Sequence, residues 1–317
     1  MDDHQIVVLV AVGPKPEDIV RLRLLLSSVM RHEPALKHLV LLDDYDECRD
    51  LPKHLHLPRA CDLTCLASRR VTDIFREYGG LFVGLLGAME WVAAQYPEAI
   101  VVKLDTDALV IRPFTEKLLI AFQVNPECGV AGVVGRTCNR AETTYGLESQ
   151  LQSPLHEIRQ LWNAQRCGNN EPPMQTVNPD LCPSWRPQFT TINNAILVAE
   201  ENGYDRLRYC QGGAYAVSPR FLGRMEHLGY FSGLHEWSHF PVGEDVILGM
   251  YVYASGMKLL DLSSKDQIFG VRWQGLPFDP EVLLQDRYSI IHSLRGNPRY
   301  PEMTLYSFFA NNVIQGP

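Results

Sequence analysis

The chain has 317 residues, of which 46% are hydrophobic and 21% are charged. This composition supports a large buried core and excludes intrinsic disorder. The 29 basic and 37 acidic residues give a net charge of −8, whereas a protein that coats nucleic acid is basic, so we expect no nucleic-acid partner. The first apolar run, Ile6–Val12, is too short to span a bilayer, and no secretory signal pattern precedes it. Eight cysteines without a CxxC pair favour free thiols. We therefore predict a cytoplasmic protein with no transmembrane segment.

Short apolar runs alternate with helical patterns in the first 135 residues. Runs without polar alternation predict strands that are buried on both faces; they are Ile6–Val12, His38–Leu42, Ala99–Leu104 and Gly129–Val134. Between them, a helix is expected to begin at Pro16, because proline and the acids after it favour a first helical turn. A second, largely apolar helix is expected over Leu81–Gln95. This alternation of strand and helix predicts an α/β fold.

The second half of the chain is less regular. Residues 137–190 show little periodicity and predict a long irregular excursion over the carboxyl edge of the sheet. Regular structure is expected again at 195–198 and at 209–218, where Ser218 and Pro219 are typical of a helix start. A helix over Asp245–Ala254, ended by Gly256, and a strand over Lys258–Leu262 follow. No linker divides the sequence, so we expect one domain.

Two acids follow the third predicted strand. Asp105 and Asp107 are separated by one residue at the point where the chain leaves the strand. Both side chains can therefore turn toward one point. A hard divalent cation prefers carboxylate and phosphate oxygens as ligands, so the pair fits a cation site for a nucleoside diphosphate. Solvated turn acids that cap the next segment are the alternative.

Three further patterns have both a functional and a structural interpretation. Gly212 and Gly213 precede a short apolar stretch and allow a ligand to approach the backbone, although a tight turn also explains them. Glu244 and Asp245 open an apolar helix, where a carboxylate either caps the helix or serves as a general base. His292 follows two isoleucines and is either a metal ligand or a hydrogen-bonded residue at a strand end.

The order of these patterns resembles the GT-A glycosyltransferases. It is most similar to the group formed by β-1,3-galactosyltransferases, N-acetylglucosaminyltransferases and Fringe-like enzymes. DIFREYGGL at 73–81 resembles the DFxDxYxNL segment of that group, and VKLDTD at 102–107 follows in the same order. YCQGGAYAVS at 209–218 resembles YCSGGGYVLS, and EDV at 244–246, with Gly249 after it, resembles EDVYVG.

The resemblance covers roughly residues 71–112 and 207–262. It implies a Rossmann-like mixed sheet flanked by helices in a single GT-A domain over residues 1–317, with a nucleotide-sugar donor half at 1–135 and an acceptor half at 136–317. It also implies a metal-dependent hexosyltransferase. Such an enzyme moves a sugar from a UDP-sugar to a hydroxyl group of a glycan or other acceptor, with inversion at the anomeric carbon.

The resemblance also implies roles for individual residues. Mn²⁺, or Mg²⁺, would be held by Asp107 and His292, with Asp105 reaching the ion directly or through water. Asp245 would deprotonate the acceptor, and Glu244 is the alternate base. Backbone at Gly212 and Gly213 would line the sugar pocket. An open α/β sheet binds ligands beyond the carboxyl ends of its strands, and the expected nucleotide contacts at those ends are Val12, Gly13 and Asp44.

Two other functions remain open from the sequence. HEWSH at 235–239 matches the HExxH pattern of zinc hydrolases, which needs both histidines on one face of an α-helix. Gly233 and Pro241 leave little room for such a helix. The third reading is a GT-A protein that binds a nucleotide sugar or glycan without transferring it. Its candidates for stacking on a sugar, which are equally candidates for the core, are Trp162, Trp185, Trp237 and Trp273.

Overall fold

The computed structural model describes residues 6–44, 49–55, 61–68, 79–135, 190–204, 208–239 and 243–312. The motif residues at 73–78, the expected excursion up to residue 189, and Trp162 and Trp185 lie outside the described residues. Within the described ranges, no helix combines the length and the apolar character needed to cross a bilayer.

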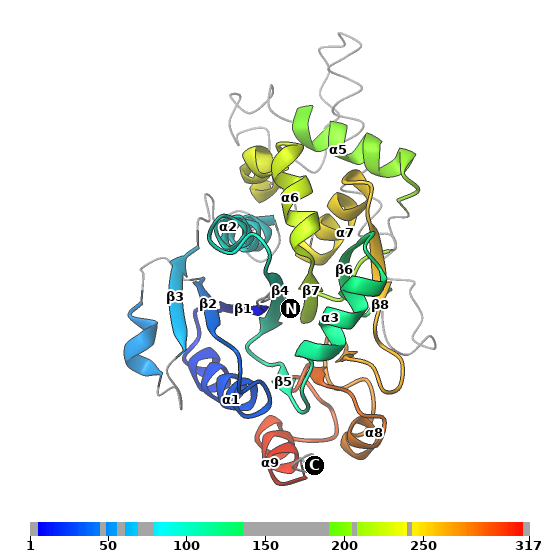
Figure 1. Ribbon diagram of the computed structural model, residues 1–317. Coiled ribbons are helices and arrows are strands. Elements are labelled where there is room, and N and C mark those ends of the chain that lie inside the picture. Colours follow the sequence, from blue (N-terminus) through cyan, green and yellow to red (C-terminus); the bar gives the residue numbers. More distant parts are fainter. Residues whose placement is uncertain are drawn as a thin grey trace, which may run out of the picture.

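A mixed sheet forms the centre of the molecule (Figure 1). Within the described residues it has seven strands, which are, in spatial order, β3 (Asp62–Ala67), β2 (His38–Asp43), β1 (Ile6–Val12), β4 (Ile100–Asp105), β7 (Ala214–Val217), β6 (Cys128–Gly132) and β8 (Lys258–Asp261). Strands β3, β2, β1 and β4 are parallel. Strand β7 is antiparallel to both of its neighbours, and β8 is parallel to β6. The expected α/β fold with a mixed sheet is confirmed.

The central strands are buried on both faces because helices cover both sides of the sheet (Figure 1). Successive side chains of a strand point to opposite faces, so Val7 and Leu9 of β1 enter one core while Val8 and Val10 enter the other. The first core is covered by α2 (Gly79–Gln95), α5 (Thr190–Glu201), α6 (Pro219–His227), the 3₁₀ helix η3 (Tyr230–His239) and α7 (Glu244–Ala254). The second is covered by α1 (Pro16–His32) and α3 (Thr115–Val124).

A smaller sheet places the C-terminal part of the chain next to the end of β4. In the described residues it has three strands, β5 (Leu109–Val110), β10 (Ile290–His292) and β9 (Phe269–Val271). It packs with α8 (Pro280–Gln285) and α9 (Glu302–Asn312), which share a third apolar core. A short 3₁₀ helix, η1 (Leu51–His54), follows β2. Because β5 directly follows the turn after β4, its antiparallel partner β10 ends beside the two acids at the end of β4 and in that turn.

Most of the expected elements are confirmed, with shifted boundaries. Ser218 accepts a hydrogen bond from the backbone N–H of Phe221 at 3.2 Å and caps α6, and Gly256 after α7 has a φ of 66°, which favours glycine. The segment at 195–198 lies inside α5. Strand β3 had no clear signal because it is a half-exposed edge strand with few large apolar side chains.

Candidate metal and catalytic site

Asp105, Asp107 and His292 come together at the carboxyl end of β4. Asp105 is the last residue of β4, Asp107 lies in the turn that follows, and His292 ends β10. His292 Nε2 is 3.2 Å from Asp107 Oδ1 and 3.7 Å from Asp105 Oδ2. One ligand atom of each residue lies within 4.8 Å of the others. Carboxylate oxygens and an imidazole nitrogen are suitable ligands for a divalent metal ion such as Mn²⁺.

Hydrogen bonds orient two of these side chains. His292 Nδ1 lies 2.8 Å from the carbonyl oxygen of Arg272. A carbonyl only accepts, so Nδ1 carries the proton and Nε2 is the atom presented to the acids. A backbone carbonyl on the distal nitrogen is a common outer-shell partner of a metal-binding histidine. Ser293 Oγ donates to Asp107 Oδ2 at 2.6 Å. These bonds prearrange the imidazole and the carboxylate.

The charges of the site favour an ionised Asp107. Burial disfavours its charged form, but His292, Ser293 and the Arg295 guanidinium together hold the pKa of Asp107 well below its usual range. For His292 burial disfavours the cation, yet the nearby carboxylates of Asp107 and Asp105 raise its pKa above the ordinary value. Arg295 itself is largely exposed, with its Nε 3.5 Å from Asp107 Oδ2.

Gly212 and Gly213 lie between His292 and the start of α7. A Cβ at Gly213 would be 2.1 Å from His292 Nδ1, so only glycine fits against this imidazole. A Cβ at Gly212 would be 3.1 Å from Glu244 Oε1 and 3.7 Å from the Cβ of Asp245. The two glycines therefore have a packing role, because they allow the metal-site histidine and the acids of α7 to lie on either side of one dipeptide. Whether they also line a sugar pocket stays a prediction.

The two acids at the start of α7 differ in their surroundings. Glu244 is buried, and its Oε1 is 2.7 Å from Lys103 Nζ. Asp245 is only partly buried, and its Oδ1 accepts from the backbone N–H of Val246 at 2.9 Å. Burial raises the pKa of Asp245 to about 6, although the N–H of Val246 and the Lys103 ammonium oppose the shift. Burial likewise raises the pKa of Glu244, and Lys103 opposes this. Asp245 is thus the acid with access to solvent.

Val12, Gly13 and Asp44 lie together at the carboxyl ends of β1 and β2. The N–H of Asp44 donates to the carbonyl oxygen of Val12 at 3.0 Å. Because β1 and β4 are parallel and Ala11 is paired with Asp105, these residues lie at the same edge of the sheet as the acids. The Arg49 guanidinium donates to the carbonyl oxygen of Gly13 at 3.0 Å, a contact that the sequence did not suggest.

No sequence pattern indicated a role for Lys103, Ser293 or Arg295. Lys103 had a detectable signal, since a lysine in an otherwise apolar strand is unusual. Ser293 and Arg295 follow His292 closely, but nothing in their spacing indicates that they contact Asp107.

The HEWSH segment lies in η3, a 3₁₀ helix. This helix repeats every three residues, so residues four apart do not share a face as the HExxH pattern requires. Within that segment Trp237 is fully buried, and its indole N–H donates to Tyr251 Oη at 2.9 Å, so it is a core residue. Trp273 is 73% exposed.

No protein-family model and no curated protein sequence matches the chain. Among solved structures, the apo structure of the WbbM bifunctional glycosyltransferase is similar to this chain with a TM-score of 0.53 at 13% identity, over 100% of this chain and 50% of that one. The chain has a GT-A-type fold. It spans half the length of the WbbM chain. The apo form of mouse xyloside xylosyltransferase 1 matches with a TM-score of 0.40 and 13% identity, over 84% of this chain and 87% of that one.

At 13% identity, the likeness to the WbbM structure shows the fold alone. The expected fold class is confirmed, whereas membership of the Fringe-like group stays a prediction, as do the donor and the acceptor.

Proposed function

We propose that this GT-A-type chain is a metal-dependent glycosyltransferase, specifically a hexosyltransferase, which moves a sugar from a UDP-sugar to a hydroxyl group of a glycan or other acceptor. The observation that carries the proposal is the convergence of Asp105, Asp107 and His292, two from the end of β4 and the turn after it and one from the end of β10. Their ligand atoms lie within 4.8 Å of one another. The GT-A-type fold and the position of this cluster at the carboxyl edge of the sheet support it.

Asp105, Asp107 and His292 would hold Mn²⁺ or Mg²⁺, which, when bound, neutralises charge on the diphosphate leaving group. His292 offers its Nε2 because Nδ1 is bonded to the Arg272 carbonyl. Asp107 keeps its orientation through Ser293. The exposed Arg295 adds positive charge on the same side.

Asp245 is the proposed base. Its carboxylate takes the proton of the acceptor hydroxyl, whose oxygen attacks the anomeric carbon with inversion while the bond from that carbon to the diphosphate oxygen breaks and UDP leaves. Glu244, the alternate base, is already engaged by Lys103. We assign the donor nucleotide to Val12, Gly13 and Asp44 in the half at 1–135, and the acceptor to the half at 136–317 of a single domain.

Thermal unfolding with UDP, with and without Mn²⁺, tests the proposal. We expect UDP to raise the melting temperature only when Mn²⁺ is present, by the equivalent of about 2.7 kcal/mol at a ligand concentration of 100 Kd. Asp107→Asn should lose this shift. Asp62→Asn, a control at a carboxylate that is 79% exposed on the edge strand, should keep it. The proposal fails if no nucleoside diphosphate shifts the transition in either condition.

A screen of nucleotide sugars with glycan acceptors then separates transfer from binding alone. Release of UDP together with glycosylated acceptor is expected of a transferase. A protein that binds the donor without transferring its sugar would show the thermal shift but no product.

A further inference from the structure

Lys103 is a buried cation between the two groups of acids in the site. Its side chain is 1% exposed. The ammonium nitrogen is 2.7 Å from Asp105 Oδ1 and 2.7 Å from Glu244 Oε1. It also donates to the carbonyl oxygen of Gly212. One side chain thus contacts the end of β4, the glycine dipeptide and the start of α7.

The position of Lys103 follows from the geometry of β4. Successive side chains of a strand alternate, so Lys103 and Asp105 point to the same face of the sheet while Val102 and Leu104 enter the opposite core. Tyr215 of β7 is the cross-strand partner of Lys103, and the ammonium lies 5.3 Å from the centre of its ring. The aliphatic stem is therefore held in the core, and the charged end reaches the carboxyl edge.

The two oxygens of Asp105 face different partners. Oδ1 is bound by Lys103, whereas Oδ2 lies 3.7 Å from His292 Nε2, on the side of the candidate metal ligands. A partner that binds one oxygen of a ligating carboxylate limits the rotation of the other, and such outer-shell contacts tune metal affinity. Without the ammonium, Asp105 and Glu244 would also be like charges with no cation between them.

We propose that Lys103 is a positioning residue that holds Asp105 in its metal-binding orientation. This inference rests on the proposed function, because it assigns the ion to the same three ligands. A buried ion pair is weak evidence of stabilisation, since an apolar residue often serves a core as well. The ion pairs of Lys103 with Asp105 and Glu244 explain why a lysine occupies this buried position in β4.

The test compares two variants, Glu244→Gln and Lys103→Met/Glu244→Gln, in which Glu244 is not left as a buried carboxylate without a cation. Lys103→Met by itself leaves Glu244 uncompensated and is expected to destabilise the fold. Glu244→Gln keeps the contact between Lys103 and Asp105, whereas the double variant Lys103→Met/Glu244→Gln removes it. Binding of Mn²⁺ to the full chain, without nucleotide, is measured by electron paramagnetic resonance of the free ion, and folding is checked by circular dichroism.

We expect Glu244→Gln to bind Mn²⁺ within about threefold of wild type, and the double variant to bind it about 10–100-fold more weakly than Glu244→Gln. Lys265→Met, a control that removes a lysine 62% exposed at the surface, should bind Mn²⁺ like wild type. If the folded double variant binds Mn²⁺ within twofold of Glu244→Gln, the positioning role is wrong.

Transfer assays separate this inference from the proposed function. In the double variant, the Mn²⁺ concentration that gives half-maximal transfer should rise. The transfer rate at saturating Mn²⁺ should match that of Glu244→Gln. A lower transfer rate at every Mn²⁺ concentration would indicate a merely structural role and overturn the inference. If wild type binds Mn²⁺ but transfers no sugar from any donor, the function fails and the Mn²⁺ comparison still decides the role of Lys103. If wild type binds no Mn²⁺, both are wrong.

Discussion

Gly213 shows how one missing side chain shapes the candidate metal site. The imidazole of His292 occupies the space where a Cβ of residue 213 would lie. The same imidazole is held on its far nitrogen by the Arg272 carbonyl, so it has little freedom to move away. In addition, the carbonyl oxygen of Gly213 accepts from the N–H of Asp105 at 2.9 Å. A shift of the backbone at Gly213 is therefore transmitted to two of the three proposed ligands.

Gly213→Ala should accordingly weaken Mn²⁺ binding by at least about tenfold and lower the free energy of unfolding by about 1–3 kcal/mol, because the added methyl overpacks a filled site. The matched control is Gly223→Ala in α6, where a Cβ would have no atom within 4 Å. That change should leave Mn²⁺ binding intact and raise stability by about 0.5–1 kcal/mol. Calorimetric titration and denaturant unfolding measure both quantities. Wild-type Mn²⁺ affinity in Gly213→Ala would contradict the packing argument.

At the scale of elements, the geometry of α7 determines which of its two first acids is exposed to solvent. The two acids occupy its first turn, where free backbone N–H groups and the helix dipole favour negative charge. Successive residues of a helix point in different directions, so Glu244 reaches inward to Lys103 while Asp245 stays partly exposed. Burial nevertheless raises the pKa of Asp245 to about 6. This is a suitable value for a base that works near neutral pH.

A base must be unprotonated, so kcat/KM for transfer should rise with pH through about 6 and level off above it. Asp245→Asn should reduce transfer by at least about 100-fold and leave Mn²⁺-dependent UDP binding unchanged. Asp279→Asn, a control at the N-cap of α8 with an exposed carboxylate, should transfer like wild type. If kcat/KM does not fall at acidic pH, or if Asp245→Asn transfers sugar at the wild-type rate, Asp245 is not the base.

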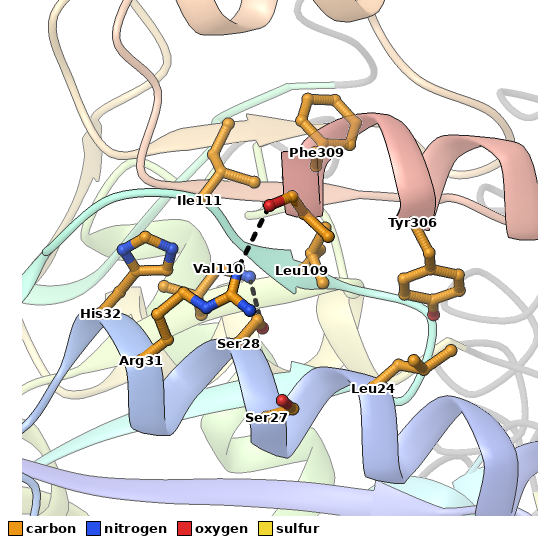
Figure 2. A pocket seen from close by; sticks show the side chains of 11 residues that line it. Leu24, Ser27, Ser28, Arg31, His32, Leu109, Val110, Ile111, Tyr306 and Phe309 are labelled. Atoms are coloured by element: carbon orange, nitrogen blue, oxygen red, sulfur yellow. Dashed lines mark hydrogen bonds between the residues drawn. The ribbon is translucent and has the colours of Figure 1, made fainter. Parts of the chain in front are cut away.

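At the scale of the whole molecule, the C-terminal segment folds back onto the N-terminal half. Helix α9 lies beside α1 (Figure 1), and Arg21 donates to both carboxylate oxygens of Glu302, at 2.7 and 2.9 Å. Between these helices and β5 lies a cavity of about 80 Å³, lined in part by Ser28, Tyr306 and Phe309 (Figure 2). None of the proposed site residues line this cavity.

Docking of α9 supports the strand that carries His292. Phe309 is fully buried in the core that also holds Ile291 and Leu294, which precede and follow His292 within two residues. Phe309→Ala should lower the free energy of unfolding by about 3–5 kcal/mol and weaken Mn²⁺ binding, since it loosens β10. The neighbouring Phe308 is only partly buried, so Phe308→Ala should cost less and keep Mn²⁺ affinity. Denaturant unfolding and Mn²⁺ titration check both. Unchanged Mn²⁺ affinity in folded Phe309→Ala would show that the packing of α9 does not affect the metal site.

Local signals account for what the sequence predicted correctly. Largely apolar runs indicated β1, β2, β4 and β6 because most side chains of a strand that is buried on both faces are apolar. Proline, serine and glycine marked the ends of helices because their backbone preferences act over a few residues. The strands β5, β9 and β10 have only two or three residues each. Segments that short form through their partners and leave no periodic pattern.

The sequence by itself determined the α/β class, the central strands and the residue types that suit a cation site. The resemblance of their order to the Fringe-like group stays a prediction. Only the tertiary structure brought Ser293 to Asp107, 186 residues away, and Glu244 to Lys103, 141 residues away. The physical reason is that strand and helix signals come from neighbouring residues, whereas the position of a buried charge depends on which distant segments pack around it.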